Sequence, residues 1–238
     1  MGKKTIMIAL GGNSLSTKGN TGSISDQFFQ ARRTMDGLSK FIDLNYNICI
    51  THGNGPQVGN ELLRMDLTSE KVPPLPLGIC VANTQGQIGY MVQQTLQNKL
   101  REKNIDREVV TLITQVIVDK NDNSINNPTK YIGPRYSLNK ITQLAKKFDW
   151  KIKEQEPGFW RRVVPSPMPE YIMHGKSIKA LVDRGTIVIA FGGGGIPVYN
   201  NNNNKIEGLN AVIDKDFSAA KMGRIIKAQE LWIISDID

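Results

Sequence analysis

Short apolar runs recur along the chain and alternate with amphipathic stretches. Several of these runs are closed by glycine or by a polar turn, which is typical of strands that are buried on both faces of a parallel sheet. The predicted strands cover residues 6–10, 48–50, 109–118, 186–191 and 231–234.

Two intervening stretches have the three-and-four spacing of apolar residues that marks one buried face of a helix. The first starts at Asp26, where Ser25 and Asp26 offer an N-terminal cap, and the second starts at Thr84. Their apolar positions are Phe28, Ala31, Met35, Leu38 and Phe41 in the first, and Ile88, Met91, Val92, Leu96 and Leu100 in the second. Strands that alternate with helices predict an open α/β sheet, with ligand-binding loops at the carboxyl ends of the strands.

Two long segments interrupt this rhythm. Residues 119–139 are polar and rich in turn residues, and residues 154–169 contain four prolines beside Trp160-Arg161-Arg162. Long irregular segments within a compact domain are usually functional, so we expect one protruding lid subdomain over residues 119–169. The asparagine run at 200–204 is interpreted as an exposed hairpin tip.

The length and composition favour one soluble domain over residues 1–238. Hydrophobic residues make up 39% of the 238 residues and charged residues 22%, which is close to the globular norm. The first apolar run is too short for a secretory signal, and no run approaches the membrane-spanning length of roughly 20 residues. We therefore expect a cytoplasmic protein that does not bind membranes.

The net charge of +8 raises the question of nucleic acid. The basic residues are scattered, however, and their densest cluster (Lys140, Lys146, Lys147, Lys151 and Lys153) lies around one predicted helix. No aromatic-and-basic motif for RNA accompanies it, so small anionic substrates are the favoured partners. Cys49 and Cys80 lie in apolar stretches and are interpreted as buried free thiols, and His52 and His174 as structural residues.

Three glycine-rich turns each follow an apolar strand: Gly11-Gly12-Asn13-Ser14, Gly53-Asn54-Gly55-Pro56, and Gly192-Gly193-Gly194-Gly195. Glycine lets the backbone approach a phosphate closely and aim N–H groups at it. One such turn is often only a tight connection, but three at strand ends predict a common crevice. None fits the spacing of a P-loop or of a dinucleotide-binding fingerprint.

The triplet Asp214-Lys215-Asp216 follows an apolar segment and precedes a helical pattern. A lysine between two aspartates can supply positive charge for a transferring phosphoryl group, together with a carboxylate that holds the lysine or binds Mg²⁺. The alternative is a solvated charge cluster.

Seven separated strings resemble carbamate kinases of the amino acid kinase superfamily, in the same order and across essentially the whole chain. They are Ala9-Leu10-Gly11-Gly12-Asn13, Thr51 to Gly59, Thr84 to Tyr90, Asn127-Pro128-Thr129-Lys130, Trp160 to Pro167, Gly192 to Pro197, and Ala211 to Asp216. The resemblance implies a three-layer αβα sandwich around a mainly parallel open sheet with a protruding lid. It also implies a homodimer in arginine metabolism that transfers a phosphoryl group between MgATP and carbamate, giving ADP and carbamoyl phosphate.

The resemblance also implies roles for individual residues. Lys215 is expected on the transferring phosphoryl, with Asp216 orienting it and Asp214 beside it, and Lys130 is expected to come from the lid. The implied carbamoyl-phosphate cradle is Gly11, Gly12, Asn13, Gly53, Asn54 and Gly55, and the implied nucleotide contacts are Gly193, Gly194 and Lys215. No protein-bound metal site is predicted. Ala9 stands where sibling kinases have a lysine, as is typical of carbamate kinases.

Three departures from the family pattern are visible. Tyr131 replaces a proline, and Pro157-Gly158-Phe159 replaces Gly-Arg-Gly near the lid. The family continues past the position of Asp238 with a Gly-Ser-Met-Gly-Pro-Lys segment and much of the adenine pocket. The amino acid kinase-like domain over 1–238 is thus expected to be incomplete at its C-terminus, and this stretch alone to synthesise negligible ATP.

Three functional hypotheses follow. The first is a carbamate kinase. The second is a pseudoenzyme or anion-binding module without a nucleotide site, which titration with an ATP analogue would separate from the first. The third is a sibling kinase that acts on another small acid, which the Asn-Pro-Thr-Lys and Trp-Arg-Arg strings disfavour.

Overall fold

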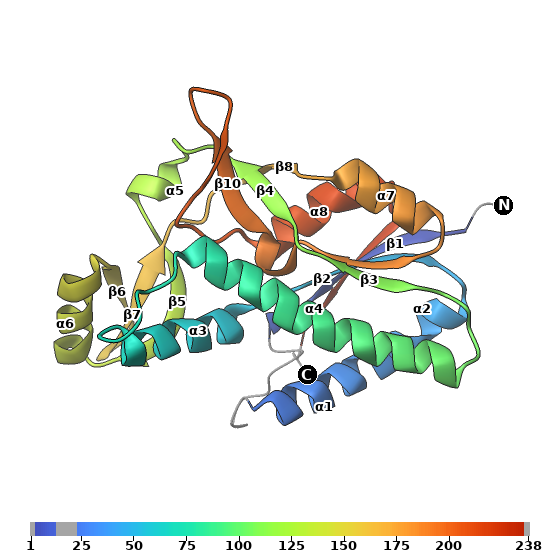
Figure 1. Cartoon of the computed structure of the whole chain (residues 1–238), viewed down its shortest axis with the longest axis horizontal. Coiled ribbons are helices and arrows are strands. Elements are labelled where there is room, and N and C mark those ends of the chain that lie inside the picture. Colours follow the sequence, from blue (N-terminus) through green and yellow to red (C-terminus); the bar gives the residue numbers. More distant parts are fainter. Residues whose placement is uncertain (1–2, 13–22, 236–238) are drawn as a thin grey trace.

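A five-stranded parallel sheet forms the centre of the protein (Figure 1). The computed structural model describes residues 3–12 and 23–235. The strand order is β12-β1-β2-β9-β3, and every neighbouring pair is parallel. The strands are β1 (Thr5–Leu10), β2 (Asn47–His52), β3 (Val109–Leu112), β9 (Ile187–Ala190) and β12 (Glu230–Ile234). The predicted parallel α/β sheet is confirmed.

Helices cover both faces of this sheet, so β1 is buried on both sides. Ile6 and Ile8 face one core, shared with α1 (Ile24–Gly37), α2 (Ser39–Asp43) and α4 (Leu77–Glu102). Met7 and Ala9 face the other core, shared with α7 (Gly175–Asp183) and α8 (Lys215–Ile226). The alternation of side chains along a strand thus produces the predicted three-layer αβα sandwich.

The predicted helix starts need correction. The N-cap of α1 is Ser23, whose side chain accepts a hydrogen bond from the Asp26 backbone N–H, so the predicted capping residues Ser25 and Asp26 lie inside the first turn. The helix ends at Gly37 and the short α2 follows it, instead of one continuous helix. α4 begins seven residues before the predicted start, because the buried positions of its apolar face continue back to Leu77.

The apolar run over 109–118 is two strands in different sheets, not one. β3 ends at Leu112, and β4 (Gln115–Val118) belongs to a four-stranded sheet of order β11-β10-β4-β8. At the break, the Thr114 backbone N–H donates to Gln85 Oε1 at 2.8 Å, so a buried side chain replaces a sheet partner. The other strands of this sheet are β8 (Pro169–Ile172), β10 (Ile196–Asn200) and β11 (Ile206–Gly208).

The antiparallel pair β10 and β11 places residues 201–205 at a turn. Within this turn Asn203 and Asn204 are exposed. The predicted hairpin tip is therefore confirmed.

Much of the segment predicted as an irregular lid is regular structure. It forms a three-stranded antiparallel sheet of order β5-β7-β6, called here the small sheet, with one helix before its first strand in the chain and another between the first two strands. The elements are α5 (Asn123–Asn126), β5 (Lys130–Tyr136), α6 (Leu138–Phe148), β6 (Lys151–Glu156) and β7 (Phe159–Val164). Figure 1 shows the small sheet and α6 at one end of the molecule, away from α7.

The small sheet is joined to the rest of the protein by a third core. Val58 and Leu62 of α3 (Gly55–Thr68) pack there with Ile132 of β5 and Val164 of β7. Because α3 starts at the glycine turn after β2, this contact positions the small sheet relative to that turn.

Cys49 and Cys80 are buried and free, as predicted. Among the described residues, no helix combines the length and the apolar character needed to cross a bilayer.

Candidate active site

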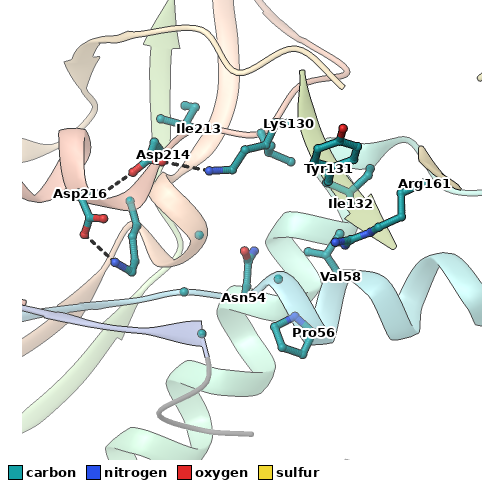
Figure 2. A pocket seen from close by; sticks show the side chains of 16 residues that line it. Asn54, Pro56, Val58, Lys130, Tyr131, Ile132, Arg161, Ile213, Asp214 and Asp216 are labelled. Atoms are coloured by element: carbon teal, nitrogen blue, oxygen red, sulfur yellow. Dashed lines mark hydrogen bonds and ion pairs between the residues drawn. The ribbon is translucent and has the colours of Figure 1, made fainter. Parts of the chain in front are cut away.

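The glycine turns predicted to meet do converge on one cavity of about 340 Å³ (Figure 2). It lies where the carboxyl ends of β1, β2 and β9 meet the start of α8, with the small sheet on its far side. The predicted residues that line it are Gly12, Gly53, Asn54, Gly55, Lys130, Gly193, Asp214, Lys215 and Asp216. Gly11 and Gly194 are not among the lining residues, and Asn13 lies outside the described residues.

The turns approach so closely that side chains would separate them. A Cβ atom on Gly53 would lie 2.6 Å from the backbone nitrogen of Gly12. A Cβ atom on Gly193, whose φ is +67°, would lie 2.2 Å from Asn54 Nδ2. Glycine at these two positions is therefore a requirement of packing as well as of anion access.

Backbone hydrogen bonds narrow the set of donors that an anion can use. The Gly11 N–H donates to Ile234 O at 2.7 Å and the Gly53 N–H to Leu10 O at 2.8 Å, so both extend the central sheet. The other backbone groups that line the cavity here belong to Gly12, Asn54 and Gly55. They lie at the N-terminus of the 14-residue helix α3. The positive end of this helix dipole faces the cavity and favours an anion there.

Buried polar side chains hold the turns in place. Asn54 Nδ2 donates to Thr84 Oγ1 at 2.9 Å, and Gln85 Nε2 donates to Gly192 O at 3.0 Å. From the other side, Ser218 Oγ donates to Gly194 O at 2.7 Å. These supporting roles were not predicted, although two adjacent polar residues on the apolar face of a predicted helix, Thr84 and Gln85, were a usable signal.

The Asp-Lys-Asp triplet is a structured part of the cavity and not a solvated cluster. Asp214 caps α8 by accepting the Asp216 N–H at 2.9 Å. Lys215 Nζ lies 2.5 Å from Asp216 Oδ1, and the Lys215 side chain is only 16% exposed. Lys130 Nζ reaches across from β5 and donates to Asp214 Oδ2 at 2.9 Å. Figure 2 shows the Lys130 side chain pointing toward Asp214 from the small sheet, with Asp216 beyond it.

Charge at this corner keeps Asp214 ionised. Burial acts to raise the pKa of the Asp214 carboxyl, but the hydrogen bonds from Lys130 and from the Asp216 N–H, with the charges of both lysines, lower it below its usual value. Lys130 therefore faces an ionised carboxylate in this structure.

Four further residues line the cavity on the side of the small sheet: Val58, Tyr131, Ile132 and Arg161. No role for them was predicted, although Arg161 belongs to a string that carries the family resemblance. Among the described residues, no group of three or more His, Cys, Asp or Glu side chains could hold a metal ion.

His52 is a structural residue beneath the cavity. It is 1% exposed, its Nδ1 lies 3.0 Å from Gly53 O, and a Cβ atom on Gly192 would lie 2.2 Å from its ring. Burial lowers the pKa of His52 to about 4, although the hydrogen bond to Gly53 O acts in the opposite direction.

We expect the free energy of unfolding to decrease as the pH is lowered, because of His52. The folded pKa is below that of the unfolded chain, so the unfolded state takes up the proton first as the pH falls from about 6.5 toward 4. The loss amounts to about 3 kcal/mol at most. Urea unfolding at pH 7.5 and 4.5 would measure it, with His52→Gln as the comparison. An equal loss in the variant would show that other groups carry the pH dependence.

Comparisons with known proteins show the family of this chain. The sequence matches the amino acid kinase family over residues 4–238. It is 45% identical to a carbamate kinase of Pyrococcus furiosus, over 100% of this chain and 76% of that protein. It is 42% identical to carbamate kinase 2 of Staphylococcus aureus, over 99% of this chain and 75% of that protein.

Solved structures show the same fold. The carbamate kinase of Giardia lamblia bound to AMP-PNP superposes with a TM-score of 0.90 at 35% identity, covering 99% of this chain and 74% of that one. The same enzyme bound to citric acid gives a TM-score of 0.91 at 35% identity, with coverage of 99% and 76%. By sequence and by fold, the chain therefore belongs to the amino acid kinase family, among the carbamate kinases.

Proposed function

We propose that this protein catalyses reversible phosphoryl transfer between ATP and carbamate, giving ADP and carbamoyl phosphate. The observation that carries the proposal is the meeting of Lys130 and Lys215, from two distant elements, at a cavity walled by glycine turns. Similarity to carbamate kinases over the whole chain supports it.

Backbone N–H groups and lysine side chains have different roles in this reaction. The backbone at Gly12, Asn54 and Gly55, with the positive end of α3, holds the phosphate of carbamoyl phosphate. Lys215 neutralises the charge that spreads over the transferring phosphoryl, and Asp216 orients its ammonium group. Lys130 adds a second positive charge from the small sheet, which acts as a lid over the reacting groups.

No general base is needed in this reaction. The attacking oxygen, on carbamate or on ADP, is already anionic, and catalysis rests on positioning and on neutralised charge. Gly193 and Gly194 lie in the turn after β9, on the side where we place the nucleotide phosphates.

Mg²⁺ fits this site as a companion of the nucleotide. The described residues offer no cage of three acidic or histidine ligands, and Mg²⁺ usually binds through substrate phosphates, waters and one or two carboxylates. Asp214 and Asp216 are the carboxylates within reach, and the ion would neutralise phosphate charge. We also place the enzyme in the cytoplasm, as a homodimer acting in arginine metabolism, by analogy with its family.

The test is ATP formation from ADP and carbamoyl phosphate with Mg²⁺, by protein expressed from its complete coding sequence. We expect saturable turnover and, by titration calorimetry, binding of AMP-PNP. Anion binding without AMP-PNP binding would favour the anion-binding module. Turnover with another acyl phosphate or phosphonate but none with carbamoyl phosphate would favour a sibling kinase.

A further inference from the structure

We propose that Arg161 binds the planar carbamoyl group of the substrate, and so selects the acceptor at the end of the cavity opposite Asp216. The inference rests on the proposed function and assigns a specificity-determining contact within that site.

Arg161 is placed at the cavity by the small sheet. Arg161 lies on β7 of the small sheet and lines the cavity together with Tyr131 and Val58. Figure 2 shows its side chain beside Val58 and below Tyr131, across the cavity from Asp214 and Asp216. The cavity thus has a cation at each end, with Lys215 and Lys130 at one end and Arg161 at the other.

The charge of Arg161 differs from those of the two lysines in having no carboxylate partner in the described part of the chain. Lys215 and Lys130 each have a carboxylate partner, but no carboxylate pairs with Arg161 among residues 3–12 and 23–235. Burial lowers the pKa of Arg161, and the charge of nearby Arg135 lowers it further, yet a guanidinium stays protonated in proteins. A partly buried charge without a counter-ion is costly, so the site is completed by an anion or a strong acceptor.

The guanidinium of Arg161 uses only part of its hydrogen-bonding capacity. Arg161 Nη1 donates to Gln155 Oε1 at 3.2 Å, whereas Nε is buried and has no hydrogen-bond partner in the described part of the chain. The guanidinium carbon lies 5.9 Å from the centre of the Tyr131 ring, and the Tyr131 hydroxyl donates to Glu154 O at 2.9 Å. The side chain is therefore fixed on one edge, and a donor on its other edge is unused.

The chemistry of a guanidinium selects the kind of ligand. Its planar fork matches a planar carboxyl-type group, with two parallel hydrogen bonds, better than a point-like ammonium does. The lysines and glycine turns at the opposite end suit the tetrahedral phosphoryl group. Carbamoyl phosphate carries one group of each kind. It therefore binds with its planar carbamoyl group at Arg161 and its phosphoryl group at the lysines and glycine turns.

The neighbouring arginines serve other purposes. Arg135 forms a two-pronged ion pair with Glu156 on the exposed surface of the small sheet, with donor–acceptor distances of 3.0 and 2.9 Å. Arg162 lies with its guanidinium carbon 4.9 Å from the centre of the Trp150 ring and does not line the cavity. Arg135 is therefore the matched control.

The test measures binding without turnover. Titration calorimetry compares phosphonoacetate, a stable probe with one phosphonate and one carboxylate, with inorganic phosphate, on the parent protein, Arg161→Gln, Arg161→Lys and Arg135→Gln. We expect Arg161→Gln to weaken phosphonoacetate binding about 10- to 100-fold and to leave phosphate binding within about twofold. Arg161→Lys should recover only part of the loss, and Arg135→Gln should bind both probes as the parent does.

Two results would overturn the proposal. Equal losses for both probes would give Arg161 a merely structural role, and unchanged phosphonoacetate binding would leave it no role in recognition. Kinetics separate this inference from the proposed function. The KM for carbamoyl phosphate should rise in Arg161→Gln while the KM for ADP stays constant, and inactivity of the parent would contradict the function instead.

Discussion

Replacing Lys215 with alanine is expected to lower kcat for ATP formation about 10³-fold, with the fold intact. We assign its ammonium group to the transferring phosphoryl because the side chain is mostly buried, lines the cavity and is paired with Asp216. The ion pair that is lost lies at the edge of the cavity and is partly solvated, so the free energy of unfolding should change by less than about 1 kcal/mol. Steady-state kinetics and urea unfolding measure the two quantities.

Lys221→Ala is the control for this substitution. It removes the same charge from the same helix, but Lys221 donates to Glu170 O and does not line the cavity. Its turnover should stay within about twofold of the parent. A Lys215→Ala variant with activity within tenfold of the parent would exclude the assigned role.

Replacing Gly53 with alanine is expected to damage both stability and substrate binding. The new Cβ atom would lie 2.6 Å from the Gly12 nitrogen and 2.8 Å from the Gly12 Cα, so two backbone turns would have to separate. Overpacking of this kind costs about 1–3 kcal/mol. Displacing the turns by a fraction of an ångström should lower kcat/KM about 10²-fold.

Gly86→Ala is the matched control for the glycine argument. Gly86 lies within α4, and a Cβ atom there meets nothing within 4 Å. Alanine should keep full activity and stabilise the helix by up to about 1 kcal/mol. If both variants behaved alike in thermal unfolding and kinetics, the close approach of the turns would not be the reason for glycine at Gly53.

The central sheet could be predicted because its evidence is local. The apolar runs at β1, β2 and β9 are buried on both faces, and a strand of that kind has a continuous apolar sequence. The convergence of the glycine turns then follows from parallel topology, since the carboxyl ends of parallel strands meet at one edge.

Other features depend on contacts that no local pattern contains. The break between β3 and β4 arises because Gln85, about 30 residues earlier in the chain, binds the backbone of Thr114. The strands β5 and β7 of the small sheet lie within the two segments predicted to be irregular, because polar, turn-forming and proline residues surround them and hide the strand pattern. Arg161 could be recognised as part of a family string. Its place in the lining of the cavity could not be predicted, because that depends on how the small sheet packs against α3.

The pairing of Lys130 with Asp214 and of Lys215 with Asp216 has a consequence for selectivity. In the free protein both ammonium groups already have internal counter-ions, so an incoming anion must compete with them. A singly charged, diffuse ion such as chloride gains little from that competition, whereas a phosphate dianion held at once by α3 and both lysines gains much more. We therefore expect Asp214 and Asp216 to weaken the binding of small monovalent anions at this cavity more than the binding of phosphate.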